Sequence, residues 1–211
     1  MRGDERLLIW SPEEIDAGLA PHRHLPALRH VLDWSRRVLV SGHPELGRTG
    51  PVCPYTQPSL RKGLFLLALP AQEGGGTPAE AVAGLRDWYE RLSADLTEED
   101  RELLTVLMLL PWLDPSDSGE LDEVQRAAKD TFVADGLMIG QFHPVCDEPG
   151  LWNEDFRPLR APVPLLAVRR LLVFDLPFLV GADRHLDAYL QRFAPEIPAR
   201  VRDQLVNRVV S

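Results

Sequence analysis

Two residues of the sequence could act directly on a substrate, and each of them stands beside prolines. His143 lies in the tripeptide Phe142-His143-Pro144, and Cys53 lies in the segment Gly50–Pro54. The proline after His143 disfavours the helical conformation at the histidine and so fixes how its side chain leaves the chain. A histidine held in this way can be a base or a metal ligand, and a rigidly held thiolate can be a nucleophile or a ligand. Both are catalytic candidates, but a histidine satisfied by a backbone carbonyl and a buried, unreactive cysteine are equally good interpretations.

Three arginines form a second group that could bind an anion. Arg157 and Arg160 lie in a proline-rich loop, and Arg169 lies in the apolar segment that follows it. Arginine forks bind carboxylates in paired geometry, so these residues predict a clamp for a carboxylate substrate or for the propionates of a haem. Surface ion pairs with the neighbouring Glu154 and Asp155 are the simpler interpretation.

The same loops contain further residues that could complete a site. Trp152 and Asn153 could supply an aromatic wall and a polar anchor, or could only hold the loop in place. Zinc binding is another interpretation, because four side chains of the types that bind zinc occur in these loops, namely Cys53, Cys146, His143 and His43. The chain has no Cys-x-x-Cys pair, so the spacing gives little support to zinc. A disulfide is also disfavoured, because the chain has only two cysteines and no secretion signal is recognised.

Composition limits the classes of protein to which the chain can belong. It has 211 residues and a net charge of −9, and its basic residues are scattered along the sequence. A chain of this length can bury a core without disulfides, and scattered basic residues argue against a nucleic-acid partner. The apolar runs are too short to cross a bilayer, and the N-terminus does not resemble a signal peptide. We therefore expect a cytoplasmic protein that binds a small molecule and neither nucleic acid nor membrane, with a homodimer as the default assembly.

The candidate residues must be positioned by helices and strands that the sequence also predicts. Two proline-rich loops, Ser41–Pro58 and His143–Pro164, are long enough that a function is expected of them. Apolar periodicity and N-cap signals predict helices, which begin at Ser11 and then cover Leu25–Val40, Thr77–Ala94, Leu121–Val133, Asp183–Phe193 and Ile197–Val209. Continuous apolar runs predict buried strands, at Gly63–Pro70, Leu103–Leu110, Leu137–Phe142 and Leu165–Val173.

Alternation of helices and strands predicts an α/β (α+β) sandwich in which helices cover a mixed sheet of about four strands. We expect a single domain over residues 1–211, with N-terminal helices in 1–40, a core in 41–193 and a C-terminal helix in 194–211. If the first and third strands were antiparallel neighbours, the loops that carry Cys53 and His143 would meet at one end of the sheet. We therefore predict one active pocket that contains both residues.

Three motifs together resemble an uncharacterised bacterial domain family: Gly50–Pro54, the stretch Gly136–Pro144 that ends in Phe-His-Pro, and Asn153–Arg169. More distantly, the layout is similar to the haem proteins of the YqcI/YcgG type, some of which hydroxylate nitrogen in small amino acids and guanidines. This second resemblance implies a haem-dependent oxidoreductase, similar to an N-oxygenase, that acts on a small nitrogen-containing metabolite in a bacterial biosynthetic pathway.

The resemblance leaves three functional hypotheses. In the first, haem b is bound without a covalent attachment motif, with His143 or, as second choice, Cys53 as its axial ligand. In the second, an enzyme without a cofactor acts on a small carboxylate, with the arginines as clamp and His143 as general base. In the third, the chain is a non-catalytic accessory protein whose Trp152 loop contacts a partner.

Overall fold

One mixed sheet organises the part of the chain that the computed structural model describes, which is residues 2–3, 7–71, 77–117, 119–194 and 197. Its strand order is β1-β2-β3-β4-β6-β5. The strands are β1 (Arg2–Gly3), β2 (Leu7–Trp10), β3 (Phe65–Pro70), β4 (Thr105–Leu109), β5 (Leu137–Phe142) and β6 (Leu165–Arg170). The α+β class and the four predicted strands are confirmed, and β2, with the two-residue β1, extends the sheet beyond the prediction.

Strand β6 lies between β4 and β5 and is antiparallel to both of them. Strands β3 and β4 are parallel neighbours, whereas β2 is antiparallel to β3. It follows that β3, β4 and β5 all run in the same direction. The predicted antiparallel pairing of the first and third strands is therefore wrong, because β4 and β6 separate β3 from β5.

Helices flank this sheet, and several of them begin at the residues that the sequence indicates. They are α1 (Pro12–Asp16), α2 (Leu25–Trp34), α3 (Thr56–Arg61), α4 (Pro78–Ser93), α5 (Glu98–Leu103), α6 (Gly119–Ala134) and α7 (Asp183–Phe193). Ser11 and Thr77 each form a capping box with the glutamate three residues later. In such a box two backbone N–H groups at the helix start receive acceptors, which explains the confirmed starts of α1 and α4.

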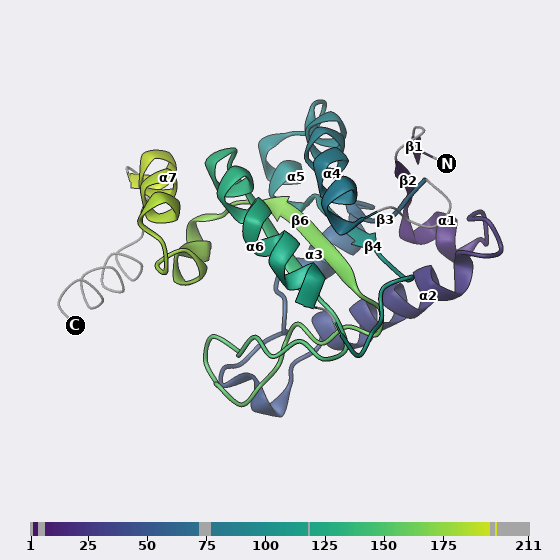
Figure 1. Cartoon of the computed structure of the whole chain (residues 1–211), viewed down its shortest axis with the longest axis horizontal. Helices are drawn as coiled ribbons and strands as arrows, with labels where there is room; N and C mark the ends of the chain where they lie inside the picture. Colours follow the sequence, from purple (N-terminus) through teal and green to yellow (C-terminus); the bar gives the residue numbers. More distant parts are fainter. Residues whose placement is uncertain (1, 4–6, 72–76, 118, 195–196, 198–211) are drawn as a thin grey trace.

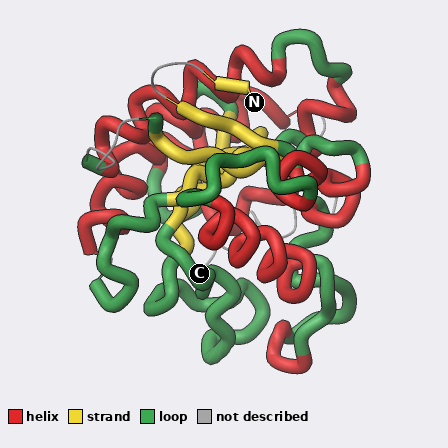
Figure 2. Tube along the Cα trace, turned by 90° about the vertical axis from the view of Figure 1, so that its right-hand side faces the viewer, coloured by secondary structure: helices red, strands yellow, loops and turns green. Residues whose placement is uncertain are grey.

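The helices pack on both faces of the sheet (Figure 2). On one face α4 and α6 bury Leu85 and Leu121 against strand residues such as Val106 and Val168. On the other face α1 and α2 cover Trp10 and Leu67, among others. Along each strand, successive side chains point to opposite faces of the sheet, as strand geometry requires. The core is therefore an α/β/α sandwich, and no helix of the described residues is long and apolar enough to span a membrane.

Several details differ from the sequence prediction. Leu103 ends α5 rather than beginning a strand, because a continuous apolar run does not mark where a helix stops and a strand begins. The last turn of the helix predicted to reach Val40 is a π-helix, η1 (Ser35–Leu39). The loop that begins at Ser41 contains a 3₁₀ turn, η2 (Pro44–Leu46), and its last residues already belong to α3. The helix predicted over 197–209 lies outside the described residues except for its first position.

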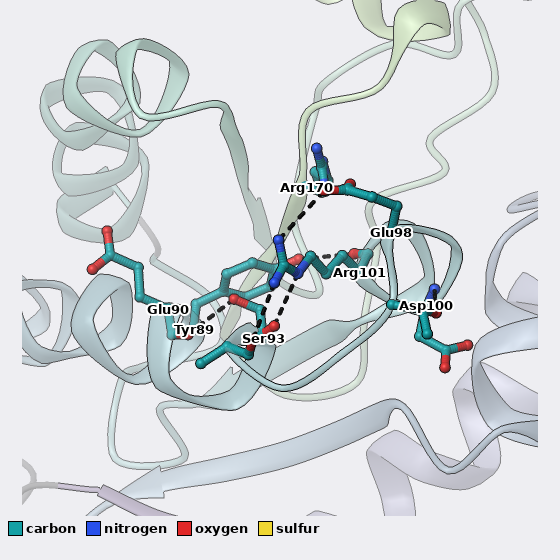
Figure 3. A network of polar contacts seen from close by, with 9 residues as sticks. Tyr89, Glu90, Ser93, Glu98, Asp100, Arg101 and Arg170 are labelled. Atoms are coloured by element: carbon teal, nitrogen blue, oxygen red, sulfur yellow. Dashed lines mark hydrogen bonds and ion pairs between the residues drawn. The ribbon is translucent and has the colours of Figure 1, made fainter.

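A polar network ties α4, α5 and β6 together at one edge of the sandwich (Figure 3). The hydroxyl of Tyr89 donates to the carbonyl of Leu104 at 3.1 Å, and Arg101 donates to the carbonyl of Ser93 at 3.0 Å. Arg170, at the end of β6, forms an ion pair with Glu98. Burial raises the pKa of Tyr89, which keeps its phenol protonated as a donor. These contacts give Arg170 a structural role.

Candidate functional site

The two proline-rich loops meet, as the sequence predicts, but through other residues than expected. The side-chain amide of Asn153 donates to the carbonyl of Glu45 at 2.8 Å, and the ring of His43 stacks on Phe156 with centroids 4.7 Å apart. Figure 1 shows the two loops side by side below the sheet. Asn153 therefore serves to hold the loops together.

Gly47 marks the closest approach of the two loops. It has a φ of 76°, and a Cβ atom at this position would lie 2.6 Å from the carbonyl oxygen of Trp152. Only glycine accommodates both the positive φ and this contact. The side chain of Trp152 itself is 56% exposed. Its backbone, rather than its indole, makes the loop contact.

Cys53 and His143 lie near opposite ends of β6. His143 follows Phe142, whose partner in the register is Leu165 at the start of β6. Cys53 instead comes two residues before Tyr55, whose ring centroid lies 5.9 Å from the guanidinium carbon of Arg169, four residues further along the strand. Four residues of a strand span about 13 Å. The single pocket predicted to contain both residues is therefore replaced by two separate groups of polar side chains.

His143 is buried and held from three directions. Its backbone N–H donates to the carbonyl of Leu159 at 3.3 Å, and its own carbonyl accepts from the N–H of Cys146 at 3.1 Å. The ring nitrogen Nε2 lies 3.0 Å from Oδ1 of Asp122. Nδ1 is buried and has no hydrogen-bond partner. The histidine is thus oriented by a carboxylate on one nitrogen while the other nitrogen is unengaged.

This pairing determines what the imidazole can do. An ionised carboxylate accepts hydrogen bonds but cannot donate them, so Asp122 selects the tautomer that carries its proton on Nε2. Nδ1 then carries a lone pair that can accept a proton or coordinate a ligand. A carboxylate in this position also stabilises the imidazolium that forms when Nδ1 takes up a proton. The arrangement therefore has the features of an oriented general base.

Asp122 lies beside His143 because the chain reverses its direction between α6 and β5. From Asp122 to the end of α6 the helix rises about 18 Å, and β5 runs back about 20 Å to His143. Gln125 fixes the register between the two elements by donating to the carbonyl of Ile139 at 2.8 Å. Asp122 was not among the predicted site residues. The sequence contains a signal that could have identified Asp122. It is an acidic residue in the first turn of the helix that leads directly into the strand before His143.

Arg157 and Arg160 lie next to this centre and share one carboxylate. Arg160 donates to the carbonyl of Cys146 at 3.0 Å and to Oδ1 of Asp147 at 2.9 Å, while Nε of Arg157 lies 3.9 Å from the same oxygen. The side chain of Asp147 is 85% exposed. These two arginines therefore contact a carboxylate of the chain itself, and it is neither Glu154 nor Asp155. That they bind a substrate carboxylate stays a prediction.

Arg169 is not part of that pair. Its guanidinium makes two hydrogen bonds to Asp175, in the 3₁₀ helix η3 (Val173–Phe178), and lies over the ring of Tyr55 with its central carbon 5.9 Å from the ring centroid. Burial would lower the pKa of Arg169, but Asp175 and then Cys53 and Tyr55 raise it above its ordinary value. The predicted clamp of three arginines is wrong in this respect.

The four predicted zinc ligands do not form one group. Within the described part of the chain, no three or more His, Cys, Asp or Glu side chains are placed to hold a metal ion. His43 packs on Phe156, Cys53 is bonded through its backbone to Leu39, and His143 is bonded to Asp122. Both cysteines are free thiols.

Comparison with known proteins shows the family to which the chain belongs. Residues 28–204 match the model of a family described as a domain of unknown function, DUF6875. The match contains the predicted core 41–193 and confirms the resemblance to an uncharacterised family. No curated protein and no solved structure was found to match the chain.

The surroundings of the two thiols predict different reactivity. Burial raises the pKa of Cys146, and Asp122 adds to this effect, whereas a hydrogen bond from the backbone of Glu148 opposes it. Because Cys53 is only half-buried, iodoacetamide at neutral pH should label Cys53 well before Cys146. Peptide mass spectrometry after short exposures measures both rates, and the protein unfolded in urea is the control in which the two should become similar. Faster labelling of Cys146 in the folded protein would contradict this account.

Proposed function

The chain belongs to the DUF6875 family of domains of unknown function, and we propose that it is an enzyme that acts without a cofactor on a small carboxylate, with His143 as the general base. The observation that carries the proposal is the state of the imidazole. Nε2 is held by Asp122, and Nδ1 is buried without a partner. Buried polar atoms are nearly always satisfied, and exceptions are concentrated where a ligand or reacting group completes them.

The proposed chemical step is the transfer of one proton. Nδ1 of His143 accepts a proton from a substrate carbon next to a carbonyl group, so that the C–H bond breaks and an N–H bond forms. The electron pair of the broken bond stays on the substrate as an enolate. Asp122 keeps its hydrogen bond to Nε2 and stabilises the imidazolium. In the reverse direction the same nitrogen returns the proton.

Binding of the substrate would use the two arginines that contact the turn after His143. The carboxylate of the substrate takes the position that Asp147 occupies beside Arg160 and Arg157. Asp147 is highly exposed, and exposed ion pairs contribute only about 0–1 kcal/mol, so the exchange costs little. Asp147 follows the turn that begins at His143, so its release also frees that turn to move. Movement is needed because His143 is only 3% exposed.

A haem-dependent oxidative enzyme is the alternative proposal, and the placement of the arginines argues against it. A haem with His143 as axial ligand would need its propionate partners around that histidine. Arg169 lies near the far end of β6 and is bonded to Asp175. Nε2 of His143 is also engaged with Asp122. The residues named for haem therefore do not fit one haem group well, and we derive no step through it.

Hydrogen exchange tests the proposed base. In D₂O, the protein should accelerate loss of the C3–H signal of small 2-oxo acids such as pyruvate and 2-oxobutyrate, followed by ¹H NMR. His143→Gln should slow this exchange by about 10²-fold or more, the usual contribution of a general base. Asp122→Asn should also slow it, because the tautomer is no longer fixed. His30→Gln, at an exposed histidine, is the matched control and should behave as wild type; exchange that survives His143→Gln would rule out the assigned base.

An absorption spectrum separates the two proposals. Purified protein mixed with hemin should give no Soret band that depends on His143, so wild type and His143→Ala should have the same spectrum. A band that is present in wild type and lost in His143→Ala would overturn the proposal of a cofactor-free enzyme and establish His143 as an axial ligand.

A further inference from the structure

Arg169 carries two hydrogen-bond donors that no described residue uses. Asp175 binds the outer end of the guanidinium, where Nη1 donates at 2.7 Å and Nη2 at 2.5 Å, and Nη1 also donates to the carbonyl of Arg170 at 2.8 Å. Nε–H and the second Nη2–H have no partner within the described part of the chain. These two N–H groups are parallel and form the side edge of the guanidinium, which matches the two oxygens of a carboxylate.

The unused donors belong to a side chain that is mostly buried and whose ion-pair partner is fixed. The side chain of Arg169 is only 22% exposed, and that of Asp175 is 5% exposed and also accepts the backbone N–H of Leu172. Asp175 is therefore held in place and cannot move to the second edge. Neither donor atom is among the buried side-chain atoms that lack a partner in the described part of the chain, so water can reach this edge. A carboxylate can displace that water and form two charge-assisted hydrogen bonds.

A pair of small residues lies on the same face of the sheet as Arg169. Gly140 and Ala167 are partners in the register and form the smallest pair on this face, between Phe142 with Leu165 on one side and Met138 with Arg169 on the other. A Cβ atom added at Gly140 would meet only the ring of Phe142, at 3.6 Å. The residues that share this face near the β5 edge are all partly exposed, namely Met138, Gly140, Phe142, Ala167 and Arg169. The helical layer thus does not fully cover the sheet here.

The groups around this face combine apolar and polar character. Tyr55 lies beneath the guanidinium of Arg169, and Cys53, two residues before Tyr55, packs against the hydrophobic cluster on this face of the sheet. The backbone N–H of Cys53 donates to the carbonyl of Leu39 at 2.8 Å, which ties it to the π-helix η1. Single π-helical turns are rare and occur often at functional sites.

We propose that this face is a second binding site, separate from the His143 centre, for a small carboxylate with a flat or compact apolar body. The carboxylate binds the Nε and Nη2 edge of Arg169, and the apolar body lies over Gly140 and Ala167. Charge complementarity selects an anion, and the small floor selects a ligand of about the size of benzoate. The site does not depend on the reaction proposed for His143.

Benzoate is a suitable probe, and Cys53 reports its binding. Saturating benzoate should slow the alkylation of Cys53 by iodoacetamide several-fold, whereas benzamide, which has the same shape without the charge, should have no such effect. Isothermal titration with benzoate measures the affinity independently. Equal protection by benzamide, or no protection and no heat of binding with benzoate, would overturn the proposal.

Two kinds of variant keep the test decisive. Arg169→Lys removes the side edge and should weaken benzoate binding by about tenfold or more, as expected for the loss of one charge-assisted hydrogen bond. Because this change also disturbs Asp175, Gly140→Val provides a second variant, in which added methyl groups occupy the floor without displacing backbone. It should abolish protection of Cys53 while the protein stays folded by circular dichroism. His143→Gln should bind benzoate as wild type does; full protection in Gly140→Val would contradict the assigned floor.

Discussion

Strand β6 is hydrogen-bonded on both sides, to β4 and to β5, and the positions of the polar residues depend on this placement. Its first residue, Leu165, is paired with the strand end from which His143 emerges. Near its other end, Arg169 meets Asp175 and Tyr55. Because the two chemical groups lie near opposite ends of β6, most of the length of the strand separates them.

The part of the fold that depends on local sequence was predictable. Ser11 and Thr77 start helices through hydrogen bonds within four residues, so the helix starts can be recognised without any knowledge of the tertiary structure. The apolar runs around β3 and β5 likewise gave strands near their observed positions. The apolar pattern predicts a strand at Leu103 because leucine suits both states, whereas the end of α5 depends on its packing.

Strand order was not predictable, because pairing is decided by contacts between residues far apart in sequence. This is why the sequence alone predicts that Cys53 and His143 lie together and that Arg169 acts with Arg157 and Arg160. The partner of His143 could have been inferred, since α6 and β5 are joined by a short turn and have nearly equal lengths. The roles of Asn153 and Arg170 as structural ties needed the structure, because the same residue types also occur in binding sites.

The contacts of His143 hold its ring in place and leave one ring nitrogen without a partner. A carboxylate fixes one nitrogen of the ring, the backbone of the following turn fixes its position, and the remaining nitrogen faces no partner. Two arginines beside it hold an exposed carboxylate of the chain itself. Because the side chain of Asp147 is 85% exposed, its ion pair is the contact at this centre that we propose a substrate carboxylate displaces.

The most direct measurement of the central claim is a two-bond ¹H–¹⁵N correlation spectrum of the histidine side chains at neutral pH, assigned with His143→Gln. The account predicts that His143 carries its proton on Nε2, that Nδ1 has the shift of an unprotonated nitrogen, and that Asp122→Asn weakens this preference. A proton on Nδ1 in the wild-type protein would make that nitrogen a donor and would contradict its role as a base.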